Sequence, residues 1–200
     1  AFIPILWNLW FFSFWSVSIV SEAAAGSTFL QAALTAVFFG LAGIAGYPAG
    51  GWLADYSKRR GWGRKWMLVA FTFVQGVLTL LFGLYVMGGG QSLLMLGGLL
   101  FAASLFFNAL QPMAQALAAD LTAPAYLGAM FGMMNLIGEI GAILSPAISG
   151  VLRDATGGWV SAVLLDTALI FAGFLLLLFV REARAAAGRA AEREPAATPE

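Results

Sequence analysis

The chain has 200 residues, of which 61% are hydrophobic and 10% are charged, and its mean hydropathy is +0.88. Soluble domains have roughly 45–50% apolar and about 25% charged residues, so this composition excludes an ordinary soluble globule and favours lipid as the main solvent. The sequence has no Cys and no His, which excludes disulfides, thiolate or imidazole metal sites and His-based catalysis.

Six windows are long and apolar enough to cross a bilayer, which takes about 20 residues per helix. They are predicted at residues 2–20, 29–50, 66–87, 92–118, 127–151 and 159–180. Because the connections are short, neighbouring helices should run antiparallel in one bundle. The sequence therefore predicts an all-α membrane protein with one transmembrane domain, residues 1–181. A charged, disordered cytoplasmic tail is predicted at residues 182–200.

The basic residues are distributed unevenly along the chain. Five lie between the second and third spans, four lie in the tail, and only Arg153 lies between the fifth and sixth spans. With six spans, the first two groups share one face of the membrane. Basic loops stay in the cytoplasm, so we expect an integral protein of the cell or inner membrane with both termini cytoplasmic.

A short pattern, G-x-L-x-D, occurs at residues 51–55 and again 99 residues later at residues 150–154. Each copy lies at the end of the second helix of a three-helix unit. Because three is odd, the two units cross the membrane in opposite directions. The sequence therefore predicts an inverted repeat, from which many secondary transporters are built.

The first copy, with the basic stretch that ends Gly63-Arg64-Lys65, resembles the loop signature of the major facilitator superfamily, G-x-L-a-D-r-x-G-R-[RK]. The gap between the Asp and the Gly-Arg-Lys is longer in this chain. Members of that superfamily have twelve spans in two halves, and the runs at 111–121, 128–139 and 145–159 resemble the second half. The resemblance implies the C-terminal six-helix half of a transporter, with the N-terminal half missing from this chain. The basic loop is also similar to that of the anion:cation symporter group.

The resemblance assigns gating roles to the residues of the loop signature. Gly51 is expected to permit close helix approach, Asp55 to interact with a neighbouring helix N-terminus, and the basic residues to pair with carboxylates. The residues with this expected role are Gly51, Asp55, Arg59, Arg60, Arg64 and Lys65.

The resemblance also implies that spans one, two, four and five face a solute cavity, while spans three and six face lipid. Polar residues at helical spacing fit this arrangement on the fourth span, and span three has only Gln75 in its interior. The expected cavity residues are Asn8, Trp15, Ser104, Asn108, Gln111, Gln115 and Asn135. Hydrogen bonding between helices is the alternative role for each of the amides.

Glu139 lies near the middle of the fifth span, where burial of a charge is costly. It is expected to be protonated, paired with the missing half, or exposed to a wet cavity, which makes it a candidate proton carrier. The alternative is a structural Glu bonded to a backbone carbonyl. No Lys or Arg falls inside a span, so helix dipoles or the other half would have to meet an anionic solute.

The predicted function is secondary active transport of a small organic solute, such as an organic anion or sugar acid, by alternating access with proton coupling. The alternative is a non-transporting membrane assembly or sensor module that retains the half-fold. An enzyme is not expected, because the sequence lacks His, Cys and a G-x-S-x-G elbow. The expected partners are the solute, protons, the lipid bilayer and the missing half, with no cofactor, metal or nucleic acid.

Overall fold

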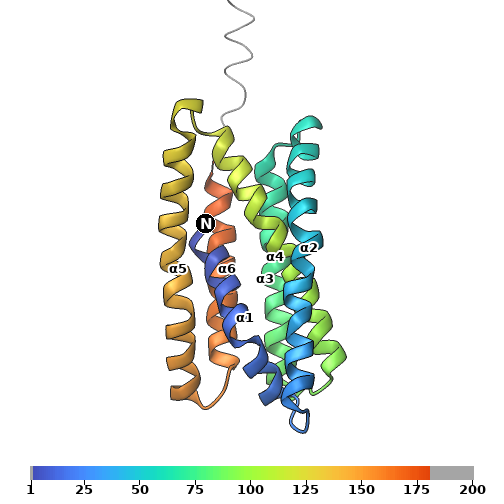
Figure 1. The fold of residues 1–200 in the computed structure, drawn as a ribbon. Coiled ribbons are helices and arrows are strands. Elements are labelled where there is room, and N and C mark those ends of the chain that lie inside the picture. The colour runs from blue at the N-terminus through green and yellow to red at the C-terminus, as the bar shows by residue number, and fades with distance from the viewer. Residues whose placement is uncertain (1, 181–200) are drawn as a thin grey trace, which may run out of the picture.

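A computed structural model describes residues 2–180, so the predicted tail at 182–200 lies outside the described residues. The described chain is a bundle of six long antiparallel helices (Figure 1). They are α1 (Phe2–Ala23), α2 (Phe29–Arg59), α3 (Arg64–Met87), α4 (Leu93–Asp120), α5 (Leu127–Thr156) and α6 (Val160–Phe179), with a short 3-10 turn, Pro124–Tyr126, before α5. All six are long and apolar enough to cross a membrane, which confirms the predicted spans and the all-α fold class.

The second helix continues well past its apolar window. It ends at Arg59 instead of residue 50, because residues 52–60 contain no Gly or Pro and the first turn residues after them are Gly61 and Gly63. These two glycines have φ angles of 75° and 79°, a conformation that favours glycine. The connection to α3 is therefore a short turn, and most of the loop signature lies on the rigid end of α2.

The helices pair across the two three-helix units. Helix α2 packs mainly on α4, α5 packs mainly on α1, and α3 lies against α6. If α1–α3 are exchanged with α4–α6, the contact of α2 with α4 becomes the contact of α5 with α1. The contact of α3 with α6 stays the same. Pro48 in α2 and Pro146 in α5 lie at matching places in the two units. This arrangement is the inverted repeat that the sequence predicts.

Close packing of these pairs depends on small residues. A Cβ atom on Gly50 of α2 would lie 2.3 Å from the backbone oxygen of Ala109, and one on Gly141 of α5 would lie 2.5 Å from the backbone oxygen of Ile3. Gly51 was expected to permit this approach, but a Cβ there would meet nothing within 4 Å. Its neighbour Gly50 has that role instead, because Gly50 lies on the side of α2 that faces α4.

An aromatic cluster fills the centre of the bundle. The ring of Phe12 on α1 lies 5.6 Å from that of Phe39 on α2 and 5.5 Å from that of Phe82 on α3. Phe39 also stacks on Phe107 of α4. The cluster joins four helices, so these phenylalanines form packing contacts in the core instead of facing lipid.

We expect Gly50→Ala to destabilise the bundle while Gly51→Ala leaves it nearly unchanged. The new methyl group at residue 50 would meet backbone atoms that cannot move aside, and overpacking of this kind typically costs about 1–3 kcal/mol. Thermal unfolding of the two purified variants measures the difference. Equal midpoints would show that the contact between α2 and α4 is looser than the structure has it.

Candidate functional site

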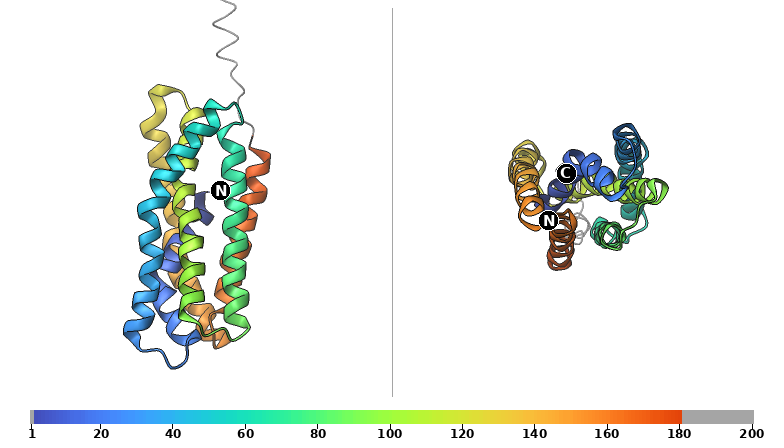
Figure 2. Two further views of the ribbon diagram at one scale, coloured as in Figure 1. Left: turned by 90° about the vertical axis from the view of Figure 1, so that its right-hand side faces the viewer. Right: turned by 90° about the horizontal axis from the view of Figure 1, so that it is seen from below.

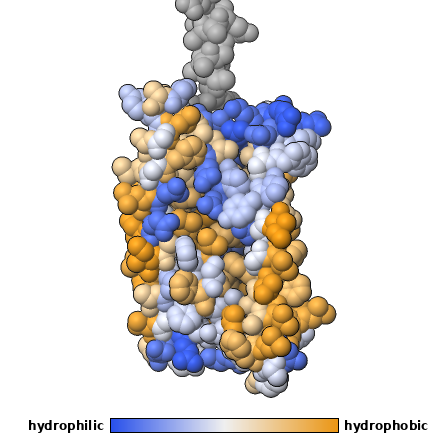
Figure 3. Space-filling model, viewed as in Figure 1, coloured by the Kyte–Doolittle hydropathy of each residue, from blue (hydrophilic) through white to orange (hydrophobic). Residues whose placement is uncertain are grey.

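One face of the bundle is bordered by α5 and α2. The buried residues of α5 all lie on the side towards α1 and are small: Gly138, Gly141, Ala142, Ser145 and Ser149. The rest of α5 and the outer side of α2 expose large apolar side chains, such as Ile143 and Ile44. Seen along the bundle, α1 lies between α5 and α2 (Figure 2). Hydrophilic residues lie between the two apolar flanks in the upper half of this face (Figure 3). We call this side of the bundle, which lies between Ile143 of α5 and Ile44 of α2, the open face.

The polar stripe of α4 is divided by the fold. Ser104 and Asn108 are buried against α2, where Ser104 Oγ donates a hydrogen bond to the backbone oxygen of Phe39. Asn108 Nδ2 donates to the backbone oxygen and to Oγ of Ser104, both at 2.8 Å. These two residues therefore stabilise helix packing and do not line an open cavity.

The other half of the stripe remains accessible. Gln111 is half-buried, and its Oε1 accepts a hydrogen bond of 2.9 Å from the hydroxyl of Tyr47 on α2. Gln115 is half-buried one turn further along α4. These two amides are therefore partly accessible, unlike Ser104 and Asn108.

Asn135 and Glu139 are both exposed on α5, one turn apart. The helical spacing places them at the edge of the stripe that faces α1. Within residues 2–180, Glu139 has no hydrogen-bond or ion-pair partner. The alternative role of Glu139, a structural hydrogen bond to a backbone carbonyl, is therefore not observed in the described part of the chain.

The expected cavity residues of α1 point elsewhere. Trp15 Nε1 donates to the backbone oxygen of Pro146 at 3.2 Å and so binds α1 to α5. Asn8 is 1% exposed and lies against α3 and α6. It contacts Gln75, which is buried and does not face lipid as its span was expected to. An amide has no hydrogen-bond partner in lipid tails, so α3 turns this residue inward.

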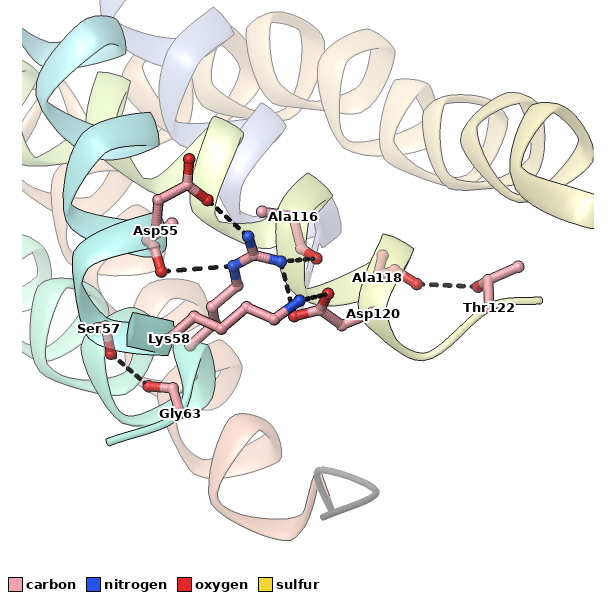
Figure 4. A network of polar contacts seen from close by, with 10 residues as sticks. Asp55, Ser57, Lys58, Gly63, Ala116, Ala118, Asp120 and Thr122 are labelled. Carbon is pink, nitrogen blue, oxygen red and sulfur yellow. Dashed lines mark hydrogen bonds and ion pairs between the residues drawn. The ribbon is translucent and has the colours of Figure 1, made fainter. Parts of the chain in front are cut away.

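The loop signature forms an ion-pair network at the end of the bundle where the connection between α2 and α3 lies (Figure 4). Arg64, the first residue of α3, contacts Asp55 of α2 and Asp120 of α4, each at 2.6 Å. Its guanidinium also donates to the backbone oxygens of Ala116 at 3.2 Å and Ala54 at 3.4 Å. One side chain, 12% exposed, therefore joins three helices.

Asp120 was not predicted as part of this network. It also pairs with Lys58 at 2.7 Å. The signature at residues 51–65 does not indicate that Arg64 has an acidic partner on α4. The sequence offered one signal for this partner: an acidic residue ends the fourth span on the same side as the basic loop.

The remaining basic residues of the signature lie outside the network. Lys65 Nζ donates to the backbone oxygen of Leu178 at 2.8 Å, and Arg60 lies over the ring of Tyr56. Arg59 is exposed, and neither Arg59 nor Arg60 forms an ion pair within residues 2–180. The structure therefore brings Asp55 and Arg64 together and leaves these two arginines at the surface.

The second copy of the pattern lies at the opposite end of the bundle. Arg153 of α5 contacts Glu22 of α1 at 3.1 Å and its neighbour Asp154 at 3.2 Å. All three side chains are more exposed than Arg64. In the part of the chain that the structure describes, no three acidic residues gather into a group that could hold a metal ion.

The family model of the Major Facilitator Superfamily matches residues 3–199. The chain therefore belongs to this family, which is a family of membrane transporters and not of enzymes. Over 189 residues the chain is 29% identical to the hexuronate transporter of Bacillus subtilis (strain 168), covering 90% of the chain and 43% of that protein. It is also 36% identical over 62 residues to the protein YjhE of Escherichia coli (strain K12), covering 31% of the chain and 74% of YjhE. The chain thus spans less than half of the hexuronate transporter.

Arg64→Ala should lower the thermal unfolding midpoint, whereas Arg59→Ala should leave it unchanged. The first variant removes a partly buried guanidinium and leaves Asp55 without its partner, while the second removes an exposed charge that contacts no acidic group among residues 2–180. Exposed ion pairs contribute little, so the difference depends on the burial of Arg64. The measurement is thermal unfolding of the full-length protein. Equal midpoints would show that the network stabilises the bundle no more than an exposed charge does.

Proposed function

We propose that the protein is a secondary active transporter that moves a small organic solute by alternating access, coupled to protons. In this proposal the chain is the C-terminal half, and an N-terminal half covers the open face and completes the cavity. The observation that supports this proposal is a set of accessible polar residues on α4 and α5, two helices of an inverted repeat. These residues are Gln111, Gln115, Asn135 and Glu139.

The solute we propose is a carboxylated sugar of the hexuronate class. The similarity to the Bacillus transporter supports this choice. The amides of Gln111, Gln115 and Asn135 each supply donors and an acceptor, which suits the hydroxyl groups of a sugar. The apolar windows at 2–20, 29–50, 66–87, 92–118, 127–151 and 159–180 contain no Lys or Arg. A solute carboxylate would therefore be met by helix N-termini or by the N-terminal half.

The Arg64 network is proposed to hold one of the two arrangements of alternating access. It joins α2, α3 and α4 only while Asp55 and Asp120 lie beside the same guanidinium. Separation of these helices would expose the charges to water and weaken the contact. We propose that Arg59 and Arg60, which are exposed, act at the boundary with the N-terminal half, and that Gly51 faces the same boundary.

Glu139 is proposed to carry the coupled proton. Its lack of a partner within residues 2–180 and its exposure on α5 leave it free to exchange protons with a wet cavity. The proton would neutralise the carboxylate while the cavity changes its access from one side of the membrane to the other, because crossing a dry state with a charge is costly.

We expect Glu139→Gln to keep solute exchange and to lose uphill accumulation. Gln resembles the protonated acid, so binding and the exchange of one solute for another should continue, but a pH gradient should no longer drive uptake. The assay compares exchange of labelled D-glucuronate with gradient-driven uptake in vesicles that contain the full-length protein. Asp154→Asn is the matched control, because it makes the same change of acid to amide at an exposed carboxyl group at the end of α5.

Uphill accumulation at the wild-type level in Glu139→Gln would exclude this residue as the proton carrier. Equal loss of exchange and uptake would point instead to a role of Glu139 in binding or folding. Wild-type protein that neither exchanges nor accumulates hexuronates would contradict the proposed solute.

We propose that the end with the Arg64 network lies in the cytoplasm. Ser57 is a poor position for a labelling test, because it is buried and its hydroxyl donates to the backbone oxygen of Gly63. A single Cys at Arg59 should resist an impermeant maleimide in intact cells, whereas one at Ala25, exposed at the other end, should react. The reverse pattern would overturn the orientation.

A further inference from the structure

A cluster of buried polar side chains joins α1, α3 and α6 away from the open face. Asn8 Nδ2 donates to Asp166 Oδ2 at 2.5 Å, and Asn8 Oδ1 accepts from Gln75 Nε2 at 3.0 Å. Each of the three residues is at most 1% exposed. The proposed solute cavity uses none of these contacts, so the cluster needs an explanation of its own.

Asp166 has no counter-ion in the described bundle. The titratable side chains on the helices packed against α6 are Glu22, Arg64, Lys65, Tyr85, Glu139, Arg153 and Asp154, and none of them bonds to Asp166. Lys65 contacts α6 at the backbone oxygen of Leu178, which is about 18 Å from Asp166 along the helix. An ionised carboxylate at this place would be buried without compensation, which is strongly unfavourable.

The cluster also has too few hydrogen-bond donors. Asp166 Oδ1 and Gln75 Oε1 are buried acceptors that receive no hydrogen bond from the described residues. The amide groups of Asn8 and Gln75 already donate within the cluster, and Gln75 Nε2 also reaches Thr79 Oγ1. A proton on Asp166 would remove the charge and turn one of the acceptors into a donor.

A small cavity beside the cluster does not account for Asp166. It measures about 10 Å³ and is lined by Asn8, Thr72 and Gln75, among other residues, but not by Asp166. That is room for about one water molecule, which could serve Gln75. It is too small for a hydrated cation, so a proton is the ligand that fits the carboxyl group.

We propose that the Asp166 carboxyl group is a proton-binding site, and that the bound proton holds α1 against α3 and α6 through Asn8 and Gln75. The site is separate from Glu139 and acts on the packing of the bundle. Because deprotonation would place an uncompensated charge in the core, the stabilisation is complete at low pH and is lost as the pH rises. The pH would thereby affect α1, which borders the open face.

The test is thermal unfolding of the full-length protein as wild type and as Asp166→Asn, measured between pH 6 and pH 9. Asn keeps an acceptor for Asn8 and adds an N–H donor, but it does not titrate. We expect the wild-type midpoint to fall across this range by at least about 4 °C more than that of the variant. The two midpoints should lie closest at pH 6 and diverge towards higher pH, because an unfolded Asp is already ionised over this range while the folded carboxyl group must lose its proton.

Glu139→Gln is the control, because it removes an exposed carboxyl group and should keep the pH dependence of the wild type. This control separates the inference from the proposed function, since unfolding is measured without any solute. Parallel profiles for wild type and Asp166→Asn would overturn the proposal. A flat wild-type profile, or an Asp166→Asn protein that does not fold at any pH, would overturn it as well, because the latter would show that the ionised carboxylate is required.

Discussion

The structure depends above all on backbone-to-backbone contact between helices of different repeats. In a bilayer, lipid tails are as apolar as the side chains, so helices associate through close packing and polar contacts. Gly50 and Gly141 bring α2 onto α4 and α5 onto α1, closer than any side chain would allow. Because these contacts use mainly small residues of α2 and α5, bulky side chains such as Ile44 and Ile143 are left on the outside, with Phe39 in the core as the exception. The open face follows from this choice of partners.

The same helix packing separates the polar residues of the bundle into a buried group and an accessible group. Those on the contact surfaces, such as Ser104 and Asn108, are satisfied by neighbouring helices, and those beside the surfaces, such as Gln111 and Glu139, are accessible. At the ends of the helices the charges serve a different purpose. Arg64 lies where α2, α3 and α4 meet, so its ion pairs depend on the relative position of three helices. In the alternating access that we propose, contacts of this kind would break and form again as the helices move.

Much of the fold could be predicted from the sequence, because span length and the odd number of helices per repeat are properties of the chain itself. The motif also indicated that its basic residues would pair with carboxylates, although it did not identify Arg64 as the partner of Asp55. Helical periodicity placed Ser104 and Asn108 on the correct face of α4, but it could not tell that α2 covers that part of the face. Asp120 and the cluster around Asp166 were out of reach for a similar reason. Their partners lie on helices distant in sequence, and only the packing brings them together.

We propose that this chain belongs to a transporter in which solute and protons move together. The most direct measurement is the pH of a weakly buffered suspension of vesicles containing the full-length protein, recorded when a hexuronate is added. We predict that the medium becomes alkaline as protons enter with the solute, and that a protonophore abolishes the change. Uptake of labelled hexuronate without any alkalinisation would contradict the coupling, and a correctly folded protein that takes up no hexuronate would contradict the assigned solute.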